Sequence, residues 1–214
     1  MTRRSKPRTE SHAGGASPGR RSGRPELPTG PGSVRIIGGT LRGRKLEYNS
    51  DERTRPMKDR VREAVFNLLG DVGGARAIDL FAGTGALGFE ALSRGAFDAW
   101  FIEQHFPTAD RIRRSAAALG VESACQVVAA DTLLWFRRGA SFPAGDRPWL
   151  VFCSPPYDLF VSRREEMLAL IEQLWSAAPA ESRFVVEADE RFDFALLPDA
   201  AAWRWREYPP ARVG

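Results

Sequence analysis

From Arg76 onward, short apolar runs alternate with segments in which apolar residues recur at helical spacing. Runs of four to six mainly apolar residues, each bounded by polar or glycine-rich turns, are typical of strands buried on both faces. The expected strands are Ala77–Phe81, Ala99–Glu103, Gln126–Ala130, Trp149–Cys153 and Phe184–Glu187. The four expected helices between them are Ala86–Ser93, Pro107–Leu119, Thr132–Phe136 and Arg163–Ala177. This alternation predicts an α/β fold with a doubly wound, mostly parallel, Rossmann-like sheet.

The segment ahead of these units has a different pattern. Val34–Ile37 and Leu41–Tyr48 flank a Gly-Gly turn, which predicts a small N-terminal β-hairpin. A polar loop follows, and Asp59 is the expected N-cap of a helix that carries Val61 and Val65 on one face. We therefore divide the chain into a tail at 1–33, a hairpin and helix at 34–70, and a main domain at 71–214.

The two ends of the chain carry further expectations. Residues 1–33 are rich in Arg, Ser, Gly and Pro and have few large apolar side chains, so we expect a disordered basic tail. At the other end, a hairpin should run from Trp203–Glu207 through two prolines into a last strand. Ala211–Gly214 leaves little room for that strand, so we expect it to be truncated.

Charge changes the picture because the net value of +4 is unevenly distributed. Residues 1–33 hold seven Arg or Lys against two Glu, and residues 34–62 hold nine basic against four acidic side chains. The rest of the chain is therefore net negative. An anionic polymer held by the front of the protein explains this asymmetry, although a solvated tail is the alternative for 1–33.

Composition narrows the class of protein. Two cysteines are too few for a disulfide framework or a zinc site, and no apolar run reaches the roughly 18 residues of a membrane span. No signal segment follows the basic N-terminus. We expect a cytoplasmic monomer with no metal and no membrane partner.

A glycine-rich turn between the first expected strand and helix is the most specific local motif. Asp79–Gly88 reads DLFAGTGALG, in which Gly83, Gly85 and Gly88 satisfy G-x-G-x-x-G. Glycines there permit a tight turn and let a ligand approach backbone N–H groups. Glu103, at the end of the second expected strand, can accept hydrogen bonds from both ribose hydroxyls. These features predict a nucleoside-type cofactor without separating NAD from S-adenosylmethionine; the alternative is a turn that binds nothing.

Asp131 ends the third expected strand. Ligands of open α/β sheets bind outside the carboxyl ends of the strands, so Asp79, Glu103 and Asp131 should face one crevice. Asp131 can accept a hydrogen bond from an adenine amino group, cap the next helix, or do both.

The motif Ser154-Pro155-Pro156-Tyr157 follows the fourth expected strand and favours chemistry on a nucleobase. Two prolines rigidify the turn and remove backbone donors, which leaves carbonyls and Ser154 to face an incoming amino group. Tyr157 offers an aromatic plane on which an extruded base can stack. A hydride-transfer enzyme has no use for this arrangement. The alternative is a proline-rich turn with a packed aromatic ring.

These residues resemble those of a known family, the bacterial RsmD type of small-subunit ribosomal RNA guanine-N2 methyltransferases. The likeness runs from about Val34 to Glu187, and its front half is the more specific part. The similar stretches are Val34–Gly39, Leu41–Leu46, Arg55–Pro56, Asp59–Asn67, Asp79–Gly88 and Ala91–Ala96.

The resemblance implies a class I methyltransferase with a seven-stranded sheet, S-adenosylmethionine as cofactor, and a guanine of 16S ribosomal RNA, free or in the small subunit, as target. Matching positions place the cofactor at Asp79, Phe81, Gly83, Gly85, Glu103 and Asp131. They place the catalytic pocket at Ser154, Pro155, Pro156 and Tyr157. The front segment, including Asp59, would approach RNA or the catalytic pocket, and the RNA-binding residues would be Arg42, Arg44, Lys45, Arg55 and Arg60.

One departure from the family concerns chemistry. The family motif usually begins with Asp, whereas this chain has Ser154, and a hydroxyl accepts hydrogen bonds more weakly than a carboxylate. Ser-Pro-Pro-Tyr also resembles the motif of some DNA cytosine-N4 methyltransferases. The alternatives are therefore an RNA or DNA amino methyltransferase acting on cytosine N4 or adenine N6, an inactive RNA-binding relative, and an NAD-dependent oxidoreductase.

Overall fold

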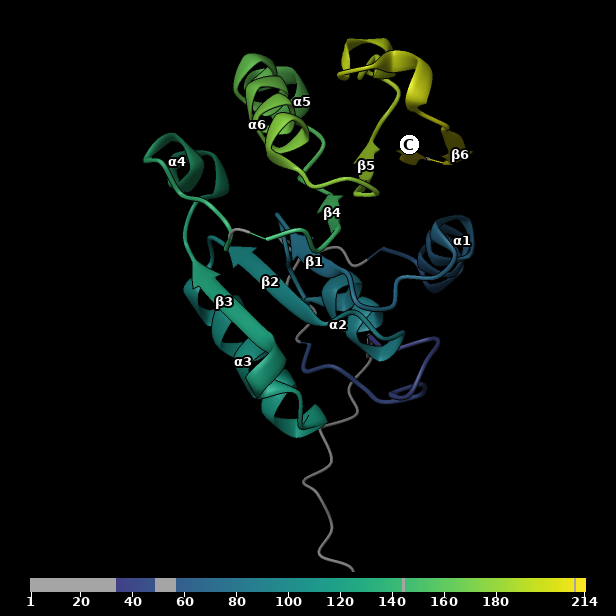
Figure 1. Ribbon diagram of the computed structural model, residues 1–214, viewed down its shortest axis with the longest axis vertical. Coiled ribbons are helices and arrows are strands. Elements are labelled where there is room, and N and C mark those ends of the chain that lie inside the picture. The colour runs from purple at the N-terminus through teal and green to yellow at the C-terminus, as the bar shows by residue number, and fades with distance from the viewer. Residues whose placement is uncertain (1–33, 49–56, 144, 210) are drawn as a thin grey trace, which may run out of the picture.

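A mixed sheet with helices on both faces organises the protein (Figure 1). The computed structural model describes residues 34–48, 57–143, 145–209 and 211–214; the tail at 1–33 and Arg55 lie outside these ranges. The described residues form a seven-stranded sheet in the order β3-β2-β1-β4-β5-β7-β6. Strands β1 to β5 are parallel, and β7 pairs antiparallel with both β5 and β6. The fold class predicted from the apolar pattern is confirmed.

The elements have the following bounds. The strands are β1 (Arg76–Asp79), β2 (Asp98–Glu103), β3 (Cys125–Ala129), β4 (Trp149–Cys153), β5 (Arg183–Ala188), β6 (Arg206–Tyr208) and β7 (Ala211–Val213). The helices are α1 (Asp59–Leu69), α2 (Ala86–Ser93), α3 (Phe106–Leu119), α4 (Thr132–Arg137), α5 (Leu159–Ser162) and α6 (Arg164–Ala177). The bounds of α2 and β4 are those predicted, and the other expected strands agree within two residues. The short helix α5 was not expected.

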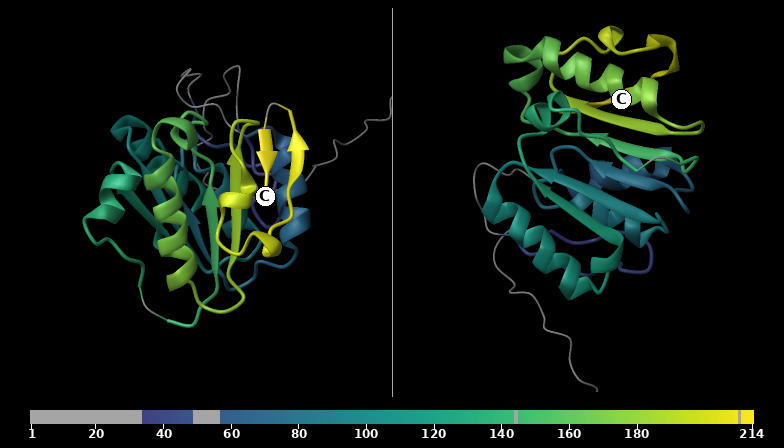
Figure 2. Two further views of the ribbon diagram at one scale, coloured as in Figure 1. Left: turned by 90° about the horizontal axis from the view of Figure 1, so that it is seen from above. Right: turned by 60° about the vertical axis from the view of Figure 1, so that its left-hand side comes forward.

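Two apolar clusters cover the two faces of the sheet. Successive strand residues point to opposite faces, so Ala77 and Ile78 belong to different clusters. Helices α1, α2 and α3 pack in the first cluster, and α4, α5 and α6 pack in the second. Seen from above in Figure 2, α1 and α6 accordingly lie on opposite sides of the sheet. Burial on both faces explains why the central strands are nearly continuous apolar runs.

The N-terminal segment packs into the same core as the sheet. Its two arms pair through a bridge between Arg35 and Lys45, which is the predicted hairpin in a short form. Val34, Ile36 and Leu46 are buried in the first cluster together with the inner face of α1. The segment at 34–48 therefore depends on the main domain for its burial.

A buried glutamate of α2 fixes this segment to the domain. The carboxylate of Glu90, fully buried, accepts hydrogen bonds from the backbone N–H groups of Ile37 (2.7 Å) and Gly38 (2.8 Å). It also accepts one from Arg94 Nε at 2.8 Å, and Arg62 Nε lies 3.8 Å from it. Glu90 thus joins α1, α2 and the hairpin in one network.

The helix start expected at Asp59 needs a correction. Helix α1 begins at Asp59 itself, and Lys58 occupies the cap position without a side-chain cap. The Asp59 carboxylate instead pairs with Arg35 and Arg62, each at 3.0 Å. Ion pairs with Arg62, one turn further along the same helix, and with the distant Arg35 therefore replace the backbone cap that the sequence suggested.

Within the ranges that the structure describes, none of the helices is long and apolar enough to cross a membrane.

Candidate active site

A cavity of about 750 Å³ opens at the carboxyl ends of the parallel strands. It spans the point between β1 and β4 where the strand order reverses, which is where open α/β sheets bind ligands. Nine of the predicted site residues line it, namely Asp79, Phe81, Gly83, Glu103, Asp131, Ser154, Pro155, Pro156 and Tyr157. The sequence did not single out several others, among them Met57, Lys58, Thr84, Gln104, Arg163, Glu187 and Tyr208.

The glycine-rich turn lines one side of the cavity just before α2 begins. Gly85 has φ 75° as the N-cap of α2, a left-handed conformation that glycine adopts without strain. Gly85 is buried and does not line the cavity. Gly88 packs so closely on the sheet that an added Cβ would lie 2.3 Å from Phe101 Cε1. Gly85 thus permits the turn and Gly88 lets α2 pack closely on the sheet, while Gly83 lines the cavity.

Asp79 lies at the end of β1 and is 1% exposed. Its Oδ2 accepts a hydrogen bond from Gly88 N at 3.3 Å, and its Oδ1 has no hydrogen-bond partner among the described residues. Burial, followed by the charge of Glu103, raises the pKa of Asp79 to about 7, against the Gly88 hydrogen bond. An unpartnered carboxylate oxygen on a cavity wall is a site for a cationic group.

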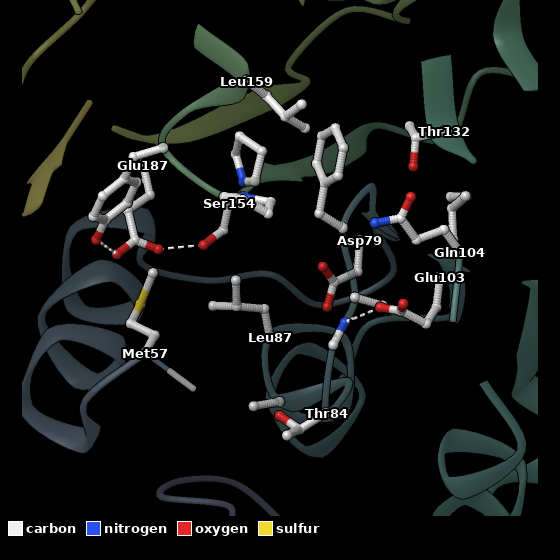
Figure 3. A pocket seen from close by; sticks show the side chains of 18 of the residues that line it. Met57, Asp79, Thr84, Leu87, Glu103, Gln104, Thr132, Ser154, Leu159 and Glu187 are labelled. Carbon is white, nitrogen blue, oxygen red and sulfur yellow. Dashed lines mark hydrogen bonds between the residues drawn. The ribbon is translucent and has the colours of Figure 1, made fainter. Parts of the chain in front are cut away.

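Glu103 is held in place by two backbone groups. Its Oε2 accepts from Gly83 N at 2.8 Å, the bond drawn at Glu103 in Figure 3. Its Oε1 accepts from His105 N, also at 2.8 Å. Each carboxylate oxygen keeps a second lone pair, so both can still accept a ribose hydroxyl. The turn and the carboxylate therefore position each other.

Asp131 has the capping role that was one of its two predicted roles. Its Oδ1 accepts from Leu134 N at 2.8 Å at the start of α4. Its Oδ2 lies 3.5 Å from Arg163 Nη1. The residue still lines the cavity, beside Thr132 and Leu133. Capping and ligand contact are compatible at this position.

The three carboxylates fit S-adenosylmethionine. This cofactor has a positively charged sulfur, an ammonium group and a ribose with two hydroxyls. Asp79 could face a cation with its unpartnered oxygen, Glu103 could accept from the ribose hydroxyls, and Asp131 could accept from the adenine amino group. NAD would place its pyrophosphate at the glycine-rich turn, beside the buried Asp79, and an ionised carboxylate there repels a phosphate.

The Ser-Pro-Pro-Tyr turn lines the cavity with both of its hydroxyls bound to one carboxylate. Ser154 Oγ donates to Glu187 Oε2, and Tyr157 donates through its hydroxyl to Glu187 Oε1 at 2.9 Å. Figure 3 shows Ser154 and Glu187 across the cavity from Glu103. Glu187, in β5, is 8% exposed. Its place near the end of the fifth strand was the only sequence signal that could have identified it.

Cys153 precedes this turn at the end of β4 and is buried. Burial, followed by the charge of Asp79, raises the pKa of the Cys153 thiol, so its nucleophilic thiolate is strongly disfavoured. The thiol fills apolar space, and we assign it no covalent role.

The four predicted RNA-binding residues that the structure describes do not line the cavity, and the fifth, Arg55, lies outside the described ranges. Arg42, Lys45 and Arg60 are exposed. Arg44 is half-buried and donates to the carbonyl of Ala118 at 2.7 Å near the end of α3, so it has a structural partner. From this part of the chain, the described residues that line the cavity are Met57, Lys58 and Val61, just before and in the first turn of α1.

Comparisons with known proteins agree with this geometry. A protein-family model described as Conserved hypothetical protein 95 matches residues 34–204. Ribosomal RNA small subunit methyltransferase D of Haemophilus influenzae is 35% identical over 152 residues, which cover 70% of this chain and 77% of that protein.

Solved structures show the same similarity. The yhhF protein of Escherichia coli matches with a TM-score of 0.66 and 31% identity, and the match covers 85% of this chain and 96% of the yhhF chain. An RNA methyltransferase of Salinibacter ruber, in complex with S-adenosyl-L-homocysteine, shares the fold at a TM-score of 0.54 and 19% identity, covering 74% of this chain and 90% of that chain. The fold, the cavity and these relatives together place the chain in the ribosomal RNA small subunit methyltransferase D family.

Proposed function

We propose that the protein transfers a methyl group from S-adenosylmethionine to the exocyclic N2 amino group of a guanine in small-subunit ribosomal RNA. One observation carries the proposal: a single cavity joins the three cofactor-type carboxylates to the Ser-Pro-Pro-Tyr turn. The similarity to ribosomal RNA small subunit methyltransferase D supports the RNA class.

One half of the cavity holds the methyl donor, and the other half holds the target base. S-adenosylmethionine supplies a methyl group that is already activated on a positively charged sulfur. Asp79 and Glu103 hold the donor by its charge and its ribose. Ser154 and the carbonyl of Pro155 accept the hydrogens of the target amino group, which directs its lone pair toward the donor. Tyr157 stacks on the extruded base, and such positioning is the main contribution that the protein makes.

The front of the protein supplies attraction for RNA. Arg42, Lys45 and Arg60 are exposed, and the segment at 34–62 has an excess of positive charge. Phosphate contacts position an RNA without reading its sequence. We propose that the protein acts as a monomer in the cytoplasm, on ribosomal RNA or on the small subunit.

A second target base follows from Ser154. A serine at this position accepts the amino hydrogens of cytosine N4 as well as those of guanine N2, because both are exocyclic amines beside a ring nitrogen. The amino group of a cytosine in RNA or DNA is therefore the second candidate.

Mapping methylated nucleotides tests the proposal. Unmodified 16S ribosomal RNA and small subunits are incubated with S-adenosylmethionine carrying a labelled methyl group, and the product nucleoside is identified by mass spectrometry. We expect N2-methylguanosine at one position. The Tyr157→Ala variant serves as the control, because it removes the stacking plane and should bind the cofactor normally. N4-methylcytidine as the product would favour the second target, and binding of NADH in preference to S-adenosylmethionine would overturn both.

A further inference from the structure

The target half of the cavity contains a carboxylate that the Ser-Pro-Pro-Tyr turn itself lacks. Glu187 reaches the turn from the neighbouring strand β5, where its backbone pairs with Val213 of β7. Its side chain lines the cavity and accepts hydrogen bonds from both hydroxyls of the turn. No Lys or Arg within the described ranges forms an ion pair with it. No described cation therefore competes with Ser154 and Tyr157 for the carboxylate oxygens of Glu187.

The direction of the hydrogen bond from Ser154 has a chemical consequence. A serine hydroxyl has one hydrogen and two lone pairs. Because that hydrogen points to Glu187, Ser154 Oγ can only accept from any further partner in the cavity. A hydrogen bond to a carboxylate is charge-assisted, and it makes the donating oxygen a better acceptor in turn.

We propose that Glu187 is the carboxylate of the target pocket and that it acts through Ser154. It is a positioning residue: it fixes Ser154 Oγ as an acceptor for a hydrogen of the target amino group, and it draws that hydrogen bond tighter as positive charge grows on the nitrogen. Tyr157 holds the other carboxylate oxygen, which keeps Glu187 in one orientation. The proposal rests on the proposed function, since it concerns the same amino group.

The same chain of groups accounts for the proton that leaves the amine. The amino nitrogen uses its lone pair to bond the methyl carbon while the carbon–sulfur bond breaks, and that bond's electron pair stays on sulfur. The nitrogen then has one proton too many. This proton passes to Ser154 Oγ as the Ser154 proton passes to Glu187, and the Glu187 carboxyl later releases it to water. Ser154 and Glu187 together thus accept the amino hydrogen and its proton, as a single aspartate at position 154 would.

Glu187→Gln tests this role because the amide keeps the size and one acceptor oxygen but removes the charge. In single-turnover assays we expect the rate of methyl transfer to fall on the order of 10²-fold, as for loss of a proton-accepting group. Affinity for S-adenosylmethionine and for RNA, measured by calorimetry and filter binding, should change by less than about twofold, because the lost interaction acts in the transition state. Glu190→Gln, an exposed glutamate three residues further on, is the matched control.

Two more variants separate a relay from a structural contact. Ser154→Ala should lose as much rate as Glu187→Gln, and the Ser154→Ala/Glu187→Gln double variant should lose little more, because both single variants interrupt the same path. Ser154→Asp in the Glu187→Gln background returns a carboxylate to the amino group and should recover at least about tenfold in rate.

The outcomes are distinguishable. If wild-type protein methylates RNA and folded Glu187→Gln is equally active, Glu187 has no such role and the proposed function stands. Additive losses in the double variant, or no recovery with Ser154→Asp, reject the relay as well. If Glu187→Gln does not fold, the rate of Ser154→Ala alone decides, since wild-type activity there excludes a path through the hydroxyl. If wild-type protein transfers no methyl group to RNA, the proposed function fails and this inference with it.

Discussion

Replacing Glu90 by alanine should weaken the attachment of the N-terminal segment to the domain and lower the stability of the protein. The carboxylate is fully buried and accepts hydrogen bonds from the N–H groups of Ile37 and Gly38 and from Arg94. Its removal leaves two backbone donors without a partner and removes the nearest negative charge from Arg94. Arg62, also buried, would keep Asp59 as its anionic partner. Burial lowers the pKa of Arg62, with Asp59 and Glu90 acting against that shift, so losing Glu90 makes the buried charge costlier.

The expected loss in free energy of unfolding is large for a single substitution. Removing one partner of a buried charged pair typically costs about 3–5 kcal/mol. For a protein of this size each kcal/mol corresponds to roughly 2–4 °C in melting temperature, so Glu90→Ala should melt on the order of 10 °C lower. Glu90→Gln keeps one acceptor oxygen, so its melting temperature should lie between those of the wild type and Glu90→Ala.

Urea denaturation followed by circular dichroism measures the free energy, and thermal melting gives an independent value. Glu63→Ala is the matched control, because Glu63 is exposed on α1 and its loss should stay within about 0.5 kcal/mol of wild type. A Glu90→Ala protein within about 1 kcal/mol of wild type would show that the network contributes no net stability, because its desolvation cost would then cancel its hydrogen bonds.

Four further predictions concern the cavity and the front of the protein. The pKa of Asp79 in the folded protein is about 7, above its ordinary 3.8, so the free energy of unfolding without cofactor should fall as pH rises from 3.8 to about 7 and stay level above that. Urea titrations at several pH values should show that Asp79→Asn lacks this pH dependence. An unchanged pH dependence in the variant would assign it to another group. S-adenosylmethionine, a cation, should bind the wild type more tightly as pH rises through the same range, and calorimetry showing constant affinity would argue against Asp79 contact. Gly88→Ala places a methyl group against Phe101 and should cost about 1–3 kcal/mol in unfolding free energy, unless the ring moves at no cost. Arg42→Gln with Lys45→Gln should lower the slope of log affinity for RNA against log salt by about two, one for each lost phosphate contact, and an unchanged slope would remove both from the interface.

The sequence alone was enough to predict the architecture and half of the cavity. Apolar periodicity is local, and strands buried on both faces leave little ambiguity, so β4 and α2 were bounded correctly from the pattern. The glycine turn carries its constraint in the residues themselves, because Gly85 needs a left-handed backbone and Gly88 leaves no room for a side chain. Glu103 followed from its place at the end of a strand beside that turn.

Only the tertiary structure decided which distant groups meet. Ser154 and Glu187 are 33 residues apart, and they touch because β4 and β5 are neighbours in the sheet. The carboxylate of Asp59 pairs with Arg35, 24 residues away, and Arg44 donates to the carbonyl of Ala118, 74 residues away. Periodicity reports which face of an element is buried, but strand order and packing determine its neighbours, and these depend on the whole chain. The sequence therefore determined the fold and the glycine-rich turn, while the contact of Glu187 with Ser154 and Tyr157 depends on the assembled sheet.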